Sequence, residues 1–390
     1  MITPSAALPS SLRPSFRAPL LLCGILFILY FISLGHPFLF DEQVIIVQNP
    51  LIKDLRLVPQ LFGQSYFYFD GRIELWNQYY RPLTAATFAI DYSFWKLNSL
   101  GYNLTNLFLH GLVVVLLYRF LLKVFGDDRT AFLSALLYAV HTAHTEAVTY
   151  TASRGDLLST VFILIAIHAY WQRKLAGSVF CYLLALLSKE SAILLPAYVF
   201  LADWCFIRTK PKTLFKNMVI FGGVAIAFLV YRRFFSPVPL GPPDYDWEST
   251  PLRFFSMGPA FLSYLQAFVL PETFKFCMSV KFALNFKDPV IFLTGFMVAL
   301  FAAALFLAAQ YRGAALFGIG FFLVGFIPGL QIVHFRPEWA EHYLYLPSIG
   351  IAFLVGCLIR SVFESRSKTL LAVFFAVYLP FTAFISYRTY

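Results

Sequence analysis

Long apolar runs, almost free of charged residues, alternate with short polar segments along most of the chain. A transmembrane helix needs about 17–25 apolar residues, fewer where it is short or broken, so most of these runs predict membrane-spanning helices. The runs 175–188 and 191–202 are too short for two ordinary spans and predict a hairpin of short helices that meet at Lys189-Glu190. The runs cover residues 18–35, 102–118, 130–145, 157–172, 175–188, 191–202, 217–231, 254–271, 289–311, 313–333, 343–359 and 369–387.

Lysine and arginine in the short loops predict the orientation, because cytoplasmic loops carry an excess of these residues. The basic loops agree with one orientation only if 254–271, rich in Phe and Tyr, lies on the outer face without crossing. This predicts eleven spans, an N-terminus in the cytoplasm and a C-terminus outside. The cytoplasmic markers are Arg13, Arg17, Arg119, Lys123, Arg129, Arg173, Lys174, Arg208, Lys210, Lys212, Lys216, Arg360, Arg366 and Lys368.

This topology predicts a single membrane domain, residues 1–390, with two large outer loops at about 36–100 and 232–288. Within the first loop, Leu83 to Leu97 is expected to form an amphipathic helix lying on the membrane. Sixteen of the twenty acidic residues fall on the outer side, which places the chemistry there. The four exceptions are Asp127, Asp128, Asp203 and Glu364.

Composition excludes other classes of protein. The chain is 59% hydrophobic and 13% charged, whereas soluble domains are about 45–50% apolar and about 25% charged. The net charge of +10 is scattered over short loops and indicates membrane topology, not nucleic-acid binding.

Five cysteines without metal-like spacing are expected to be small buried apolar residues. The run 18–35 is expected to stay as a first helix, although a signal peptide has the same pattern.

Ionisable groups inside or beside spans cost at least about 2.5–3.5 kcal/mol each on insertion scales, which makes them candidates for function. Asp41-Glu42 follows the first span by a few residues, where a carboxylate can act as a base or a metal ligand. A solvated loop is the alternative explanation for two adjacent acids.

A second candidate group lies between the third and fourth spans. His141, His144 and Glu146 have a spacing compatible with zinc, but imidazoles at an interface also form hydrogen bonds without metal. Arg154 and Asp156 open the fourth span, where an arginine could hold a phosphate.

Lys189-Glu190 is expected at membrane depth in a polar cavity, with a structural ion pair as the alternative. An anionic ligand is the expected partner of Lys189, because Glu190 would point about 100° away on a continuous helix. The remaining outer-face candidates are Arg81, His110, Arg336, Glu341, His342 and Tyr345.

Together these residues form a recognisable order of motifs. Asp41-Glu42 is followed by Tyr80-Arg-Pro-Leu-Thr84, a motif from Gly101 to His110, a motif from Ala139 to Val148, Arg154-Gly-Asp-Leu-Leu158, Leu187-Ser-Lys-Glu-Ser191 and a motif from Ala340 to Gly350. The order resembles the membrane half of the transmembrane-and-TPR O-mannosyltransferases and their bacterial relatives, within the GT-C superfamily. The likeness covers about residues 36–350. The TPR repeats are not found in these 390 residues, which leaves a protein acceptor open.

The resemblance implies a GT-C glycosyltransferase that moves a sugar, for example mannose, from a polyprenyl phosphate to a hydroxyl on the outer face, with inversion. It implies Asp41 as base and Glu42 as its partner. Arg154, Lys189, Arg81 and Arg336 would hold the phosphate, supported by His110, His141, His144, Glu146, Asp156, Glu190, Glu341, His342 and Tyr345. The acceptor would be a protein, a glycan or a lipid. No cofactor is required by the pattern, and a divalent ion such as Mg or Mn stays open.

The resemblance also implies a location. The chain would be a multi-pass protein of a bacterial inner membrane, or of the endoplasmic reticulum membrane in a eukaryote, with its site on the outer or lumenal face. A lipid-linked sugar flippase or another polytopic transporter is the alternative, because such proteins also use acids within the membrane. The large asymmetric outer loops and the lack of an internal repeat favour the transferase.

Overall fold

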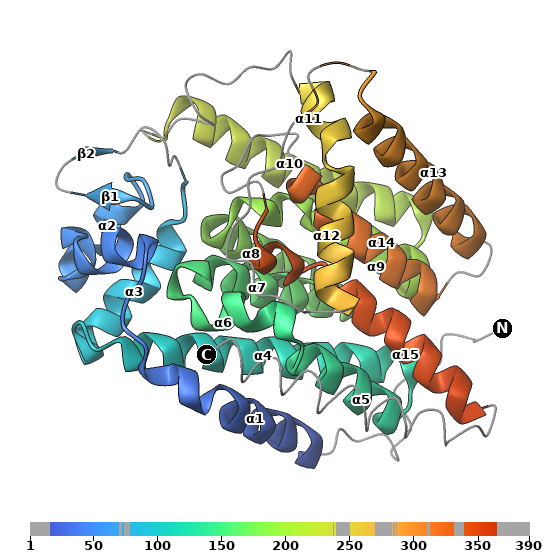
Figure 1. Cartoon of the computed structure of the whole chain (residues 1–390), viewed down its shortest axis with the longest axis horizontal. Helices are drawn as coiled ribbons and strands as arrows, with labels where there is room; N and C mark the ends of the chain where they lie inside the picture. The colour runs from blue at the N-terminus through green and yellow to red at the C-terminus, as the bar shows by residue number, and fades with distance from the viewer. Residues whose placement is uncertain are drawn as a thin grey trace.

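The computed structural model describes residues 16–69, 72–73, 79–236, 238, 250–269, 283, 285, 287–309, 313–330 and 339–364 (Figure 1). Three sequence predictions fall outside this part of the chain: the phosphate role of Arg336, the last apolar run, 369–387, and the position of the C-terminus.

Helices make up nearly all of the regular structure. They are α1 (Arg17–Tyr30), α2 (Val58–Leu61), α3 (Pro82–Trp95), α4 (Ser99–Phe125), α5 (Asp128–Ala139), α6 (Thr145–Thr149), α7 (Arg154–Trp171), α8 (Leu175–Ser188), α9 (Leu195–Ala202), α10 (Pro211–Phe234), α11 (Thr250–Ser256), α12 (Gly258–Val269), α13 (Pro289–Ala309), α14 (Ala314–Phe326) and α15 (Ser348–Glu364). Two-residue strands, β1 (Tyr68–Phe69) and β2 (Arg72–Ile73), pair antiparallel with Tyr68 opposite Ile73.

The predicted all-α, multi-pass class is confirmed. Within the described residues, five helical segments are long and apolar enough to cross a membrane: Arg17–Gly35, Ser99–Phe125, Thr151–Trp171, Glu190–Ile207 and Pro211–Phe234. Leu175–Ser188, Pro289–Leu300 and Ala314–Leu330 are shorter apolar helices. The eleven crossings inferred from the loop charges stay a prediction.

Helix ends follow the local sequence. Asn98 and Asp127 accept the backbone N–H groups of Leu100 and Thr130, which caps the starts of α4 and α5. Between these helices Gly126 adopts φ 68°, a left-handed conformation that glycine tolerates and that ends α4. The chain therefore reverses within a few residues, and α5 packs back along α4.

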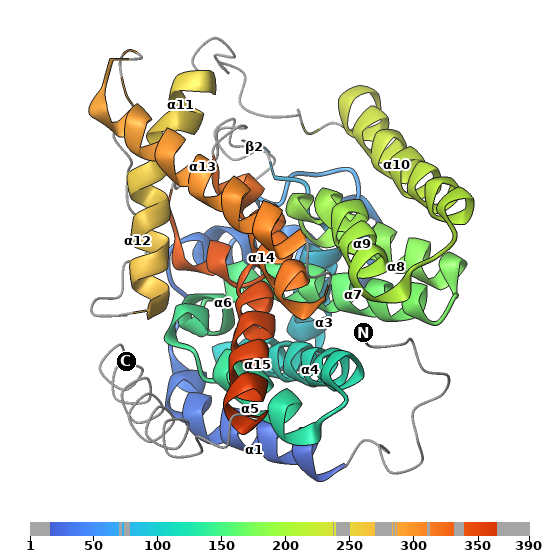
Figure 2. The same ribbon diagram turned by 90° about the vertical axis from the view of Figure 1, so that its right-hand side faces the viewer.

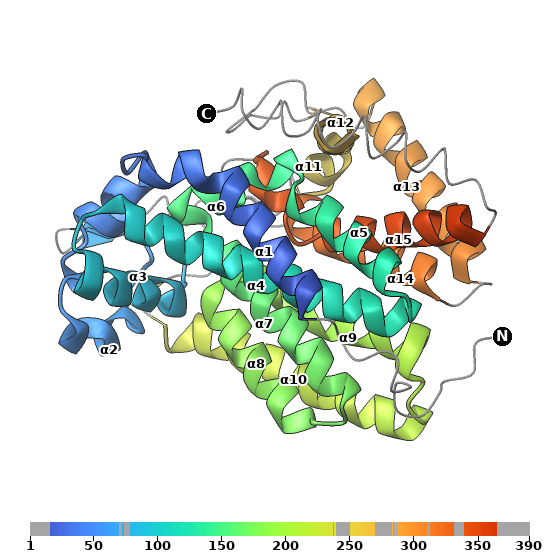
Figure 3. The ribbon, with the colours of Figure 1, turned by 90° about the horizontal axis from the view of Figure 1, so that it is seen from below.

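The main core lies around α4, which packs against α1, α5 and α7 (Figures 1 and 3). By contrast, α10 lies at the periphery beside α8 and α9 (Figure 2). Only 11% of the apolar window of α10 is buried, and Phe215, Val219 and Ile226 are exposed. An apolar helix that faces outward on most of its surface is expected to contact lipid.

The segment predicted as the first outer loop forms a small unit at one end of the molecule, where α2, α3, β1 and β2 gather (Figure 1). Its core includes Phe38, Ile45, Tyr66 and Phe88, and it is joined to α4 through Tyr102. The segment 254–271, predicted not to cross, is broken near Met257 into α11 and α12. Neither helix is long enough to be a candidate span.

Candidate functional site

The acidic pair Asp41-Glu42 is divided into one exposed and one buried carboxylate. Glu42 is fully buried, and its two oxygens accept the backbone N–H groups of Leu39, at 2.7 Å, and of Thr151. Asp41 is exposed. Phe40 precedes it with φ 44°, a left-handed conformation that is uncommon for a bulky residue and that is found preferentially at functional sites. The turn thus directs Glu42 inward and Asp41 outward.

Three contacts fasten this loop to the segment just before α7. His36 donates from Nε2 to the carbonyl of Thr149 at 2.7 Å. The backbone N–H of Asp41 donates to the hydroxyl of Tyr150 at 3.1 Å, and Glu42 binds the N–H of Thr151. Asp41 is therefore held beside the N-terminal end of α7.

Burial raises the pKa of Glu42 above its ordinary value, because the charged form loses its hydration. The N–H groups of Leu39 and Thr151 oppose this shift but do not cancel it. Burial also raises the pKa of Tyr66, whose hydroxyl donates to the carbonyl of Ala152 at 3.1 Å. Asp41, Glu42 and Arg81 all act electrostatically on that hydroxyl, so Tyr66 lies near both the acidic pair and the cations.

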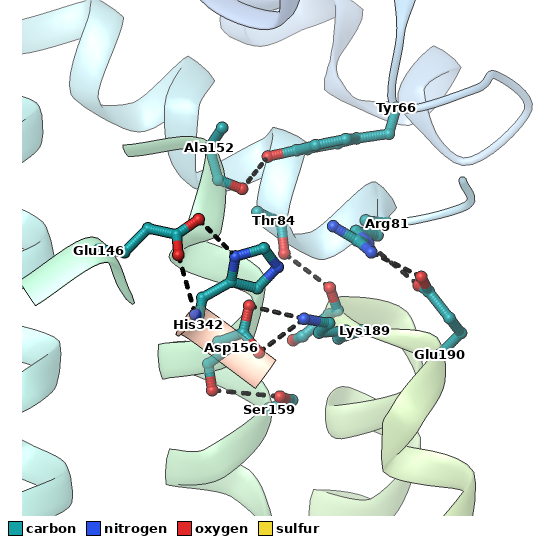
Figure 4. Close-up of polar contacts among 11 residues, drawn as sticks. Tyr66, Arg81, Thr84, Glu146, Ala152, Asp156, Ser159, Lys189, Glu190 and His342 are labelled. Carbon is teal, nitrogen blue, oxygen red and sulfur yellow. Dashed lines mark hydrogen bonds and ion pairs between the residues drawn. The ribbon is translucent and has the colours of Figure 1, made fainter. Parts of the chain in front are cut away.

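The cations of the site belong to two adjacent ion pairs (Figure 4). Nζ of Lys189 lies 2.6 Å from both carboxylate oxygens of Asp156, and it lies 5.5 Å from the ring centre of Tyr343. Nε and Nη2 of Arg81 bind the two carboxylate oxygens of Glu190 at 3.0 and 2.5 Å. The structural ion pair that the sequence left open for Lys189 is present, with Asp156 of α7 as the acid and not Glu190.

The predicted break at Lys189-Glu190 is present. Helix α8 ends at Ser188, and Lys189 is extended, with φ −155° and ψ 139°. The second short run, 191–202, belongs to a longer helical segment that extends from η8 (Glu190–Leu194) through α9 to Ile207. This segment is long enough to cross a membrane.

A close approach of backbones fixes this break against α7. The carbonyl of Ser188 accepts the hydroxyl of Thr84 at 2.9 Å. A Cβ atom on Gly155 would lie 3.0 Å from that carbonyl oxygen, so a side chain there would push α7 and α8 apart. Glycine between Arg154 and Asp156 therefore lets Asp156 reach Lys189.

Arg154 is fully buried and has protein partners on three sides. Its Nη1 pairs with Asp91 at 2.6 Å, and Nε donates to Asn106 at 2.7 Å. Nη2 donates to the carbonyl of Tyr102 at 2.9 Å, and the guanidinium lies 4.5 Å from the ring centre of Phe88. These contacts favour a role in holding α3 against α4 and α7.

The predicted supporting residues Glu146 and His342 form a pair. Glu146 is buried and accepts Nδ1–H of His342 at 2.7 Å and its backbone N–H at 3.0 Å (Figure 4). Glu341, next to it in η11 (Glu341–Leu344), is also buried. Through these two hydrogen bonds, Glu146 connects α6 to the motif from Ala340 to Gly350.

The other predicted histidines are satisfied by protein groups. In His110, Nδ1 lies 2.7 Å from the hydroxyl oxygen of Tyr345, and Nε2 lies 3.1 Å from the carbonyl oxygen of Ala139. In His144, Nδ1 lies 2.7 Å from the carbonyl oxygen of Tyr138, and Nε2 lies 2.8 Å from Oγ of Ser348.

His141 follows the same pattern, with Nε2 2.8 Å from the carbonyl of Phe268 and Nδ1 accepting the N–H of Ala143 at 3.2 Å. A carbonyl can only accept, so one nitrogen of each ring carries a proton, and the second nitrogen of each ring already lies within hydrogen-bond distance of a protein hydroxyl or N–H group. Across the described part of the chain, no group of three or more His, Cys, Asp or Glu residues could hold a metal ion.

Sequence reasoning missed Asp91, Tyr66, Tyr150 and Arg232. Asp91 carried a usable signal, since it is the one acid between Leu83 and Leu97, a segment that was predicted to lie on the membrane. Tyr66 and Tyr150 had no such signal, because tyrosine is common in the outer loops. Arg232 ends a span in a position that also fits a simple interface anchor.

Taken together, the fold and the site define a polytopic helical membrane protein with an exposed acid and a group of ion pairs. The chain is 32% identical to protein O-mannosyl-transferase TMTC3 of Homo sapiens over 183 residues, which is 44% of this chain. It is 29% identical to protein O-mannosyl-transferase F38B6.6 of Caenorhabditis elegans over 218 residues, or 55% of this chain. It is also 34% identical to TMTC1 of Homo sapiens over 170 residues. The predicted resemblance is confirmed.

The chain spans about a fifth to a third of the length of these relatives: 20% of human TMTC3, 31% of F38B6.6 and 19% of TMTC1. No family model matches it. The crystal structure of ArnT from Cupriavidus metallidurans bound to undecaprenyl phosphate aligns with 91% of this chain and 62% of that chain, at 13% identity and a TM-score of 0.44.

Proposed function

We propose that the chain is a membrane glycosyltransferase of GT-C type that moves a sugar, mannose in the first instance, from a polyprenyl phosphate to an acceptor hydroxyl. The observation that carries the proposal is the sequence match to several protein O-mannosyl-transferases. The arrangement of acids and cations around α7 supports it. The site would lie on the outer or lumenal face, and the acceptor would be a hydroxyl on a protein, a glycan or a lipid.

In the proposed reaction Asp41 is the general base. The acceptor oxygen attacks the anomeric carbon of the sugar while Asp41 takes the hydroxyl proton. The bond from that carbon to the phosphate oxygen breaks, and its electron pair leaves with the polyprenyl phosphate. Attack opposite to the leaving group inverts the anomeric configuration. The exposure of Asp41, beside a buried Glu42 that holds the turn, supports this division of roles.

The negative charge that grows on the leaving phosphate needs nearby cations. Arg81 and Lys189 are the proposed cations, because both lie beside the break at the C-terminal end of α8. Arg154 is less suited to this role, since its guanidinium is enclosed by Asp91, Asn106 and Tyr102. Arg154 would instead keep α7 in position beneath the acidic loop.

The test is transfer by the purified full chain in nanodiscs. Radiolabelled polyprenyl-phosphate mannose is supplied with a serine- and threonine-containing peptide, a glycan or a lipid acceptor. Label that appears in an acceptor through a new glycosidic bond supports the proposal, and Asp41→Asn serves as the matched inactive variant. Label that crosses a vesicle membrane while still attached to lipid would support the flippase instead and overturn the transferase.

A further inference from the structure

The Arg81–Glu190 pair is more open to solvent than the other ion pairs of the site. The side chains of Arg81 and Glu190 are 13% and 25% exposed. The side chains of Lys189 and Asp156 are 7% and 9% exposed. Those of Arg154 and Asp91 are the least exposed, at 0% and 7%. An anion that approaches these pairs from outside therefore meets Arg81 first.

Arg81 is held in place by more than its carboxylate partner. Its guanidinium carbon lies 4.6 Å from the ring centre of Tyr79 and 5.5 Å from that of Tyr66. Tyr66 is itself fixed by its hydrogen bond to the carbonyl of Ala152. Arg81 also directly precedes Pro82, the first residue of α3. Its guanidinium is thus expected to stay where it is when the carboxylate leaves.

Glu190 lies directly after the break in the helix and has a second cation in its surroundings. It follows the extended residue Lys189 and is the first residue of η8, so its side chain lies at the start of a helical segment, next to the break. Arg232, near the end of α10, lies over the ring of Tyr80 at 4.7 Å from its centre. Glu190 acts electrostatically on Arg232 as well as on Arg81. Arg232 is therefore the candidate partner for the carboxylate when it leaves Arg81.

We propose that Glu190 occupies Arg81 in the ligand-free protein and is exchanged for the phosphate of the lipid-linked sugar, while Glu190 turns to Arg232. This inference rests on the proposed function. A carboxylate and a phosphate present two oxygens to an arginine in the same way, as Glu190 does to Nε and Nη2. A phosphodiester carries one negative charge, like the carboxylate it replaces. The exchange therefore leaves the charge beside Arg81 unchanged.

The test measures binding of polyprenyl-phosphate mannose to the full chain in nanodiscs, with the free polyprenol as the control ligand. Glu190→Gln removes the competing charge and is expected to bind about two- to fivefold more tightly, the range for a partly exposed ion pair. Arg81→Met is expected to bind about tenfold or more weakly. Asp91→Asn, which opens a sealed pair, is the matched control and should give no gain in affinity.

A second variant tests the exchange without altering Glu190. Arg232→Gln removes the alternative partner, so the carboxylate stays on Arg81 and binding should weaken about two- to fivefold. A thermal melt accompanies each variant. Affinity for Glu190→Gln that equals or falls below that of the wild type overturns the exchange and leaves the transferase standing. Absence of phosphate-dependent binding in the wild type and in every variant overturns the proposed function and this inference together.

Discussion

Lys189 and Glu190 are adjacent in the chain, yet Lys189 binds Asp156 on α7 while Glu190 binds Arg81 before α3. The extended conformation of Lys189 makes this possible, because it ends α8 and redirects the next side chain. One break in one helix thus joins three separate segments of the chain. The two pairs differ in burial, so we expect their disruption to have different consequences.

Lys189→Met is expected to destabilise the protein strongly, because it leaves the buried carboxylate of Asp156 without its partner. Removing one member of a buried ion pair typically costs about 3–5 kcal/mol of unfolding free energy. The double variant Lys189→Met with Asp156→Asn should recover most of that loss. Thermal melts of the two proteins in the same detergent provide the measurement. Equal melting temperatures for the single and the double variant would show that Asp156 has another partner.

Asp41→Asn is expected to lower the rate of sugar transfer by about 10²–10⁴-fold, the usual contribution of a general base. Donor affinity and melting temperature should change little, since the side chain is exposed and the contact to Tyr150 uses the backbone. Single-turnover transfer and donor binding are measured on the same preparation. A loss of less than tenfold would move the base to another residue.

Glu42 gives a prediction about pH. Burial raises the pKa of Glu42 in the folded protein above the ordinary value of 4.5. Between that value and the raised one, the folded state binds more protons than the unfolded state, so this carboxyl makes the protein less stable as pH rises. The stability of the wild type relative to Glu42→Gln should therefore fall as pH increases above about 4.5.

Melts of the wild type and of Glu42→Gln from about pH 4 to pH 7 test this sign. Taking the difference between the two proteins removes the titration of the other groups. A difference that instead favours the wild type as pH rises would mean that the N–H groups of Leu39 and Thr151 stabilise the ionised form more than burial disfavours it.

The topology inferred from the loop charges predicts opposite sides for two polar segments. A single cysteine at Lys53, in the first outer loop, should react with a membrane-impermeant thiol reagent applied from the outside. A cysteine at Lys212, at the start of α10, should react only after the membrane is opened. Both would be made in a background without the five native cysteines. Reaction of both from the same side would overturn the orientation.

Much of the fold follows from local sequence. The apolar run 175–188 coincides with α8, and the break at Lys189-Glu190 lies where the charges interrupt the run. By contrast, the run 102–118 understates α4, which continues at both ends through Ser99 and Phe125. A helix can continue through polar and basic residues at its ends when neighbouring helices pack on it. Such residues lie outside the apolar run, so the run alone predicts a helix that is too short.

The ion pairing was less accessible to sequence reasoning. Lys189 and Asp156 are 33 residues apart, and their contact depends on the register of α7 against α8, which Gly155 sets by close packing. Arg154 was expected to hold a phosphate because its motif begins a span, but Asp91 lies within reach once α3 packs on α7. Pairing across elements depends on tertiary geometry, which hydropathy does not encode.

The contacts between the acidic loop and residues 149–151 have an evolutionary consequence. They use the carbonyl of Thr149 and the N–H of Thr151, so much of the anchorage comes from main-chain atoms that every amino acid except proline possesses. Threonine at these positions can therefore be replaced without loss of those bonds, whereas Glu42 has no such freedom. These two main-chain bonds should therefore be less sensitive to substitution at Thr149 and Thr151 than to substitution of Glu42. An insertion or deletion between Tyr150 and Arg154 would displace the proposed base without altering a single acidic residue.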